Sequence, residues 1–153
     1  MLLTHICQSN SVRVPLQSKE KMDAIAELID LLDENGLLVD KAAVSEAVFA
    51  RENTRSTGIG SGIAIPHGKC KAVKELVMAI GLAPDPIDFE SIDNKPVTIV
   101  ILLVSPTDQT GPHIQALAKI SRLMLDEDFK QAFEQAQTAE EAYRLLREKE
   151  SEQ

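Results

Sequence analysis

Two apolar segments in the second half of the chain limit its fold more than any other feature. Residues 76–83 read LVMAIGLA and residues 97–104 read VTIVILLV, and both have the length of a strand. Neither segment alternates with polar residues, as a strand with one face in water would. We therefore predict two central strands that are covered by other elements on both faces.

Helical patterns precede these strands. Apolar residues recur at helical spacing over residues 22–32. We expect Ser18 to be the N-cap of this helix and Gly36 to follow its end. Asp40 is the expected N-cap of the next helix, because an apolar stripe begins just after it. One further step along that stripe reaches Arg51, which should therefore point toward the interior.

The flanks of the chain contain further elements. Within residues 11–16, Val12 and Val14 alternate with polar neighbours and the pattern ends at Pro15, which predicts a short edge strand. Pro112 fits the first position of a helix that carries His113 on its apolar face. Two shorter helices follow, and Thr138 is the expected N-cap of the second. We expect the charged residues 147–153 to fray.

The element order predicts an α/β (α+β) fold with a mixed sheet packed between helical layers, and no boundary divides residues 1–153 into domains. Two acidic runs should be solvated. They are residues 126–128 and 148–150.

The charge and the apolar pattern exclude several classes of partner. The net charge is −8, from 24 acidic and 16 basic residues. Nucleic acids and anionic membranes call for the opposite sign. No apolar run has membrane-spanning length, and the first residues lack a secretory pattern. We therefore expect no direct membrane insertion. Cys7 and Cys70 lie far apart in the sequence, so we expect no disulfide and a reducing cytoplasm.

A glycine-rich stretch, GIGSGIAIPHGK, surrounds one histidine, His67, with four of the seven glycines of the chain. Patterns for nucleotide binding fail, because Ile63 stands three residues after Gly60 and Cys70 replaces the Ser or Thr of a Walker loop. A hydrolase elbow also fails, since its nucleophile position is Gly60. The three histidines lack the spacing of a metal site, and we expect no metal or cofactor.

His67 can instead act as a nucleophile, because a neutral imidazole has a ring nitrogen lone pair that can attack phosphorus. Arg51 can neutralise phosphate charge, and His113 lies in a first helical turn, which favours anions. Taken singly, His113 also fits a helix-face histidine and Arg51 an ion-paired residue. Partly exposed Ile59, Ile63 and Ile65 would form a docking surface. Residues expected to clear the approach or position phosphate are Gly60, Ser61, Gly62, Pro66 and Gly68.

The run STGIGSGIAIPHG, residues 56–68, resembles the enzyme IIA proteins of the fructose/mannitol type from the bacterial phosphoenolpyruvate-dependent phosphotransferase system. The preceding Arg51-Glu52 and the later LLVSPTDQTGPHIQAL match as well, and the resemblance covers nearly the whole chain. It implies a three-layer α/β/α sandwich. Ser61 departs from the usual Asn, which puts the local geometry of the loop in question.

The resemblance also implies a function. His67 would accept a phosphoryl group from the phosphocarrier HPr or a paralogue, with Arg51 and His113 flanking it. The nitrogen-regulatory branch, which the chain most resembles, would use its phosphorylation state to regulate protein partners. Two alternatives stay open. One is a component of fructose or mannitol uptake that passes phosphate to a IIB domain. The other is a binding module that has kept the fold without phosphotransfer.

Overall fold

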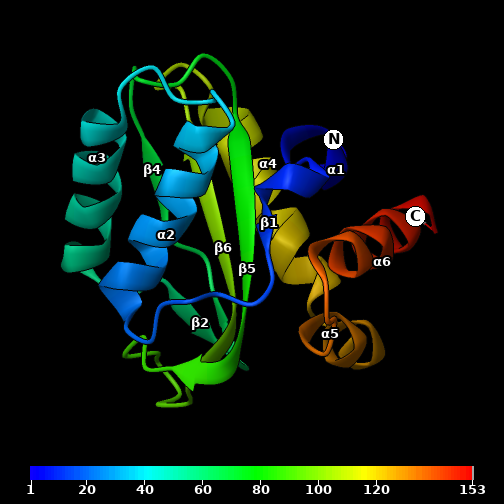
Figure 1. Cartoon of the computed structure of the whole chain (residues 1–153). Coiled ribbons are helices and arrows are strands. Elements are labelled where there is room, and N and C mark those ends of the chain that lie inside the picture. The colour runs from blue at the N-terminus through cyan, green and yellow to red at the C-terminus, as the bar shows by residue number, and fades with distance from the viewer. Residues whose placement is uncertain (153) are drawn as a thin grey trace.

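The computed structural model describes residues 1–152, which form helices and the strands of a single sheet (Figure 1). The helices are α1 Leu3–Ile6, η1 Ser9–Ser11 (a 3-10 turn), α2 Lys21–Glu34, α3 Lys41–Thr54, α4 Thr110–Leu123, α5 Glu127–Glu134 and α6 Ala139–Ser151. The strands are β1 Val12–Arg13, β2 Gly58–Gly60, β3 Ile63–Ala64, β4 His67–Lys69, β5 Val77–Ile87 and β6 Val97–Ser105.

The two predicted central strands are confirmed as β5 and β6. They pair antiparallel, with Val77 opposite Val104 and Ile87 opposite Val97. The sheet is mixed, because β1 joins β5 in parallel, β3 and β4 both join β6 in parallel, and β2 joins β3 antiparallel. The order along the sheet is β1-β5-β6-β3-β2, with β4 also paired to β6.

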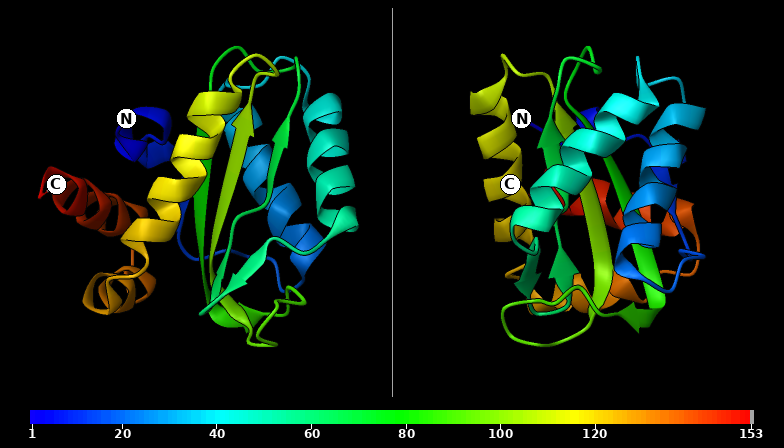
Figure 2. Two further views of the ribbon diagram at one scale, coloured as in Figure 1. Left: turned by 180° about the vertical axis from the view of Figure 1, so that it is seen from behind. Right: turned by 90° about the vertical axis from the view of Figure 1, so that its left-hand side faces the viewer.

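Helices cover both faces of the sheet, so the three-layer α/β/α arrangement is confirmed. Figure 1 shows α2 and α3 on one side of the strands and α1, α4, α5 and α6 on the other, and Figure 2 shows the same layers from behind and from the side. Alternate residues of one strand enter different cores: Ile99 and Ile101 pack with the α4 layer, whereas Val100 and Leu102 pack with the α2 layer. Two apolar faces explain why these strands have no polar alternation.

Two of the three predicted helix N-caps were confirmed. Asp40 and Thr138 cap their helices by accepting hydrogen bonds from the backbone N–H groups of Ala43 and Glu141. Ser18 is not a cap, because its hydroxyl donates to Glu27 instead and α2 begins only at Lys21.

Three predicted boundaries also shift. The edge strand is limited to Val12–Arg13, since proline at the following turn offers no N–H to a sheet. Strand β5 runs past Ala83 to Ile87, with an irregular register that accommodates two prolines. Pro112 is the third residue of α4 rather than the first, which still places it in the first turn.

The C-terminal prediction was wrong over the described residues. Helix α6 continues through Ser151, and Gln153 lies outside the described part of the chain. Glu150, expected in solvent, is buried and accepts hydrogen bonds from the backbone N–H groups of Leu3 and Thr4, at 2.7 and 2.9 Å. Its carboxylate also pairs with Lys119 at 3.0 Å. These contacts stabilise the last turns of α6 against fraying.

Within residues 1–152, no helix combines the length and the apolar character that crossing a membrane requires.

The carboxylate of Glu150 should contribute strongly to stability. We expect Glu150→Ala to lower the free energy of unfolding by about 3 kcal/mol, because it removes the carboxylate that pairs with a mostly buried Lys119 and leaves two backbone N–H groups without their acceptor. Glu148→Ala is the matched control, since Glu148 is exposed and, within residues 1–152, its carboxylate pairs with Arg144 alone, on the same helix. Urea unfolding measures both variants, and equal losses would contradict the prediction.

Candidate active site

His67 opens strand β4 and lies beside the carboxyl-terminal half of β6, opposite Leu103. Its ring Nδ1 lies 2.8 Å from the backbone carbonyl of Ile65. A carbonyl oxygen can only accept a hydrogen bond, so Nδ1 carries the proton in the neutral ring. The other nitrogen, Nε2, therefore keeps its lone pair.

His113 lies on α4, and its ring contacts the ring of His67 at the end of the sheet. It is buried in the first turn of α4, which follows β6 after a short loop. The two imidazole rings have centroids 5.3 Å apart and are inclined at 63°. Nδ1 of His113 lies 2.6 Å from the hydroxyl of Ser105, the last residue of β6. The structure thus brings together two histidines that lie 46 positions apart in the sequence.

Arg51 completes the predicted trio. It lies in the last turn of α3, half-buried, and its Nη1 donates a hydrogen bond to the backbone carbonyl of Arg55 at 2.8 Å. The guanidinium lines a cavity of about 340 Å³ together with His67 and His113. Because a backbone carbonyl holds one nitrogen, the remaining N–H groups are oriented for an anion.

Lys69 is a cation that sequence reasoning missed. It lies two residues after His67 on the same strand and lines the same cavity. Its Nζ donates to the hydroxyl of Thr110, in the first turn of α4, at 3.4 Å. The signal was present in the sequence, since residues i and i+2 of a strand face the same side.

Both histidines are held neutral near pH 7. Burial lowers the pKa of His67, and the positive charges of Arg51 and Lys69 lower it further, against the opposing hydrogen bond to Ile65. Burial lowers the pKa of His113 to about 4, with further contributions from His67 and Lys69. A neutral ring can act as a nucleophile or as a single hydrogen-bond donor.

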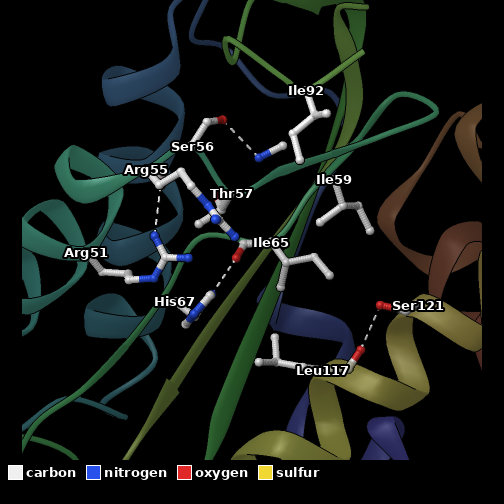
Figure 3. Close-up of a pocket in the computed structure, with 11 residues that line it drawn as sticks. Arg51, Arg55, Ser56, Thr57, Ile59, Ile65, His67, Ile92, Leu117 and Ser121 are labelled. Carbon is white, nitrogen blue, oxygen red and sulfur yellow. Dashed lines mark hydrogen bonds between the residues drawn. The ribbon is translucent and has the colours of Figure 1, made fainter.

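A second cavity of about 250 Å³ adjoins the first and shares Arg51, His67 and Leu117 with it. Figure 3 shows Arg51 and His67 on one side of it and Ile59, Ile92 and Leu117 on the other. Ile59 is 47% exposed and Ile92 is 79% exposed.

The expected surface roles of two other isoleucines were wrong. Ile63 and Ile65 are only 2% and 3% exposed, because both side chains belong to the core on the α4 side of the sheet. Of the three predicted docking residues, only Ile59 presents a large apolar surface.

The structure does not bring the predicted loop residues Gly60, Ser61 and Gly62 to His67. They form the turn between β2 and β3, with positive φ angles of 98°, 58° and 82°, and the N–H of Ser61 donates to Asp93. β3 pairs with β6 at Ile99, four residues before the partner of His67. The glycines therefore serve hairpin geometry, for which left-handed backbone is required.

Pro66 and Gly68, the other two predicted residues, do flank His67. The carbonyl of Pro66 accepts a hydrogen bond from Leu103 at 3.0 Å, which fixes β4 on β6. A Cβ on Gly68 would lie 3.1 Å from the side chain of Val48 and 3.2 Å from its backbone nitrogen. Helix α3 can therefore lie directly on β4, which sets Arg51 above His67.

Glu52 supports the same corner from inside. Its buried carboxylate pairs with Lys21 at 2.9 Å and accepts hydrogen bonds from the N–H and hydroxyl of Thr57. This residue ties the end of α3 to the segment leading into β2. A carboxylate next to an arginine gives no sign of burial in the sequence alone.

The low pKa of His113 makes stability depend on pH. An unfolded histidine has a pKa near 6.5, so the unfolded chain binds this proton more readily and stability falls as pH drops from about 6.5 toward 4. Between pH 7 and pH 5, we expect wild type to lose about 2 kcal/mol more unfolding free energy than His113→Gln. Urea unfolding at both pH values measures this difference, and parallel losses would refute it.

Comparison with known proteins identifies the family of the chain. Residues 5–149 match the family model described as "Phosphoenolpyruvate-dependent sugar phosphotransferase system, EIIA 2". The chain is 36% identical over 137 residues to a nitrogen regulatory protein of Escherichia coli, covering 88% of this chain and 81% of that protein. It is 34% identical over 138 residues to the fructose-specific EIIABC component of Bacillus subtilis, covering 90% of this chain but only 22% of that protein.

Solved structures share the fold. The nitrogen regulatory protein IIA-Ntr of Neisseria meningitidis superimposes with a TM-score of 0.85 at 30% identity, covering 94% of this chain and 98% of that one. The mannitol IIA of Escherichia coli gives 0.76 at 22% identity, covering 90% and 96%, and shows the fold alone. By its sequence match over nearly its full length, the chain belongs to the EIIA type 2 family of the phosphoenolpyruvate-dependent sugar phosphotransferase system.

Proposed function

We propose that the chain is a phosphocarrier of the nitrogen-regulatory type, which accepts a phosphoryl group on Nε2 of His67 from HPr or an HPr paralogue in the cytoplasm. One observation carries the proposal. Nδ1 of His67 is committed to the carbonyl of Ile65, and the ring borders a cavity that is also lined by Arg51, Lys69 and His113. A neutral nucleophile among cationic and neutral donors suits a phosphoryl acceptor.

The transfer conserves atoms and charge without a further reactant. The Nε2 lone pair of His67 attacks the phosphorus of the donor's phosphohistidine, and a new N–P bond forms. The N–P bond in the donor breaks, and its electron pair returns to the donor nitrogen. Nδ1 of His67 keeps its proton throughout, because that proton is hydrogen-bonded to Ile65. The phosphoryl group can then pass to an acceptor by the same step in reverse.

The surrounding side chains divide the stabilisation of the phosphoryl oxygens. Arg51 offers its unoccupied N–H groups, and Lys69 adds a second positive charge from the strand. His113 offers a hydrogen bond without adding charge, because it is neutral at this pH. We assign no phosphate contact to the turn at residues 60–62.

The regulatory output is supported by the relatives. The chain covers 81% of the nitrogen regulatory protein of Escherichia coli and shares 30% identity with IIA-Ntr of Neisseria meningitidis. Uptake of fructose or mannitol, with transfer to a IIB domain, is the alternative, and the fructose-specific relative favours it. A binding module without phosphotransfer fits less well, because Arg51, His67 and His113 all line one cavity.

The phosphorylated residue can be identified by mass. After incubation with phosphoenolpyruvate, enzyme I and HPr, we expect one acid-labile phosphoryl group on wild type and none on His67→Ala, which lacks the nucleophile. His5→Ala is the matched control, since His5 is exposed and distant in the sequence, and it should be phosphorylated like wild type. A phosphorylated His67→Ala would assign the nucleophile elsewhere.

Adding a purified IIB domain of the fructose or mannitol type to the phosphorylated protein then separates the two outputs. Rapid loss of phosphate to IIB would favour uptake, whereas retention would favour regulation. If HPr gives no phosphate, the HPr paralogue is the next donor to use, and failure with both would favour the binding module.

Arg51 should act on the rate of transfer. We expect Arg51→Gln to slow phosphoryl acceptance about 100-fold, because a preorganised donor to the transferring group is lost. The pKa of His67 should rise at the same time, since the charge of Arg51 lowers it. Rapid-quench kinetics and NMR titration measure the two effects. The control, Arg144→Gln, removes an exposed arginine and should leave both unchanged; a wild-type rate in Arg51→Gln would contradict this role.

A further inference from the structure

Ser105 is a buried residue of the site that the phosphocarrier proposal does not yet use. We propose that its hydroxyl is a positioning group, which holds His113 with its proton on Nε2 so that this N–H can donate to the phosphoryl group on His67. The hydroxyl lies 2.6 Å from Nδ1 of His113. Ser105 is fully buried, and His113 is only 3% exposed. The inference rests on the proposed function of His67.

The backbone leaves the hydroxyl little freedom. Ser105 ends β6, where its residue is in register with Lys69 of β4, and its carbonyl accepts a hydrogen bond from the N–H of Cys70 at 3.0 Å. Strand β6 is paired with β4 on one side and with β5 on the other. From this fixed strand the side chain of Ser105 reaches His113 on α4. The position of the hydroxyl relative to the first turn of α4 is thus set by the sheet.

The direction of the hydrogen bond follows from satisfying buried donors. Among the described residues, Nδ1 of His113 is the one hydrogen-bond partner of the Ser105 hydroxyl. If Nδ1–H donated to the oxygen, the hydroxyl proton would be buried without an acceptor, which is unfavourable. If the hydroxyl donates to Nδ1, its proton is satisfied and the ring proton must be on Nε2.

The tautomer decides what His113 can offer. A ring with a pKa of about 4 has a single N–H near pH 7. Phosphoryl oxygens only accept hydrogen bonds, so Nε2–H is attractive to them and an Nε2 lone pair is repulsive. The neighbouring ring, His67, lies with its centroid 5.3 Å away, which brings a group on its Nε2 within reach of His113. Without the Ser105 hydroxyl, Nδ1 of His113 would lose the hydrogen bond that favours the tautomer with its proton on Nε2.

Imidazole ¹⁵N NMR of the full chain at pH 7 tests the first half of this proposal. We expect wild type and Ser105→Thr, which keeps the hydroxyl, to show His113 protonated on Nε2. Ser105→Ala should show a substantial fraction protonated on Nδ1. Ser11→Ala is the control, because it removes another buried hydroxyl, which contacts Asn35 and does not line the cavity of His113. A wild-type His113 protonated on Nδ1, or an unchanged tautomer in Ser105→Ala, would overturn the inference.

The rate of phosphoryl acceptance from phosphorylated HPr tests the second half. We expect Ser105→Ala to be slower about tenfold, in keeping with the loss of one well-placed hydrogen bond, while Ser105→Thr and Ser11→Ala keep the wild-type rate. A shifted tautomer with an unchanged rate would overturn the role in transfer. Failure of wild type to accept phosphate from HPr or its paralogue would overturn the proposed function itself, and the NMR result would still decide the tautomer.

Discussion

The parallel pairing of β4 with the end of β6 is the contact on which the site depends. It places His67 opposite Leu103, so that His67 and the last residues of the central strand share one end of the sheet. The chain leaves β6 at Ser105 and returns in α4, which brings His113 back over the same end. Ligand sites at the carboxyl ends of parallel strands are a general property of α/β sheets, and the candidate site lies at such an end, beside the three-residue strand β4.

The charged side chains at this end of the sheet have the opposite sign to the net charge of the whole molecule. The chain carries a net charge of −8, yet Arg51 and Lys69 line the cavity beside His67. Burial lowers the pKa of both histidines; Lys69 lowers both further, and Arg51 lowers that of His67. The cavity therefore combines two cationic side chains with two neutral imidazoles, and the imidazoles differ in the partners of their Nδ1 atoms.

The sequence predicted those features that depend on local pattern. The two apolar runs identified β5 and β6, and the setting of His67 led to Arg51 and His113, which line one cavity. It failed where long-range contacts decide. Nothing near Glu150 indicates that Leu3 and Lys119 would surround it, and glycines that suggest phosphate binding form a distant hairpin turn. Lys69 and Ser105 look like ordinary strand residues until the register of β4 and β6 is known.

The hydrogen bond between Leu3 and Glu150 joins residues 147 positions apart, and this has a consequence for the order of events during synthesis. The sheet can close as soon as β6 has been made, but the first helix has no carboxylate to hold it until residue 150 has been translated. Contacts between residues that are distant in the sequence form late in folding, because the entropy lost on closing such a long loop is smaller once other parts of the chain are in place. The earliest residues of the chain should therefore be among the last to reach their final place.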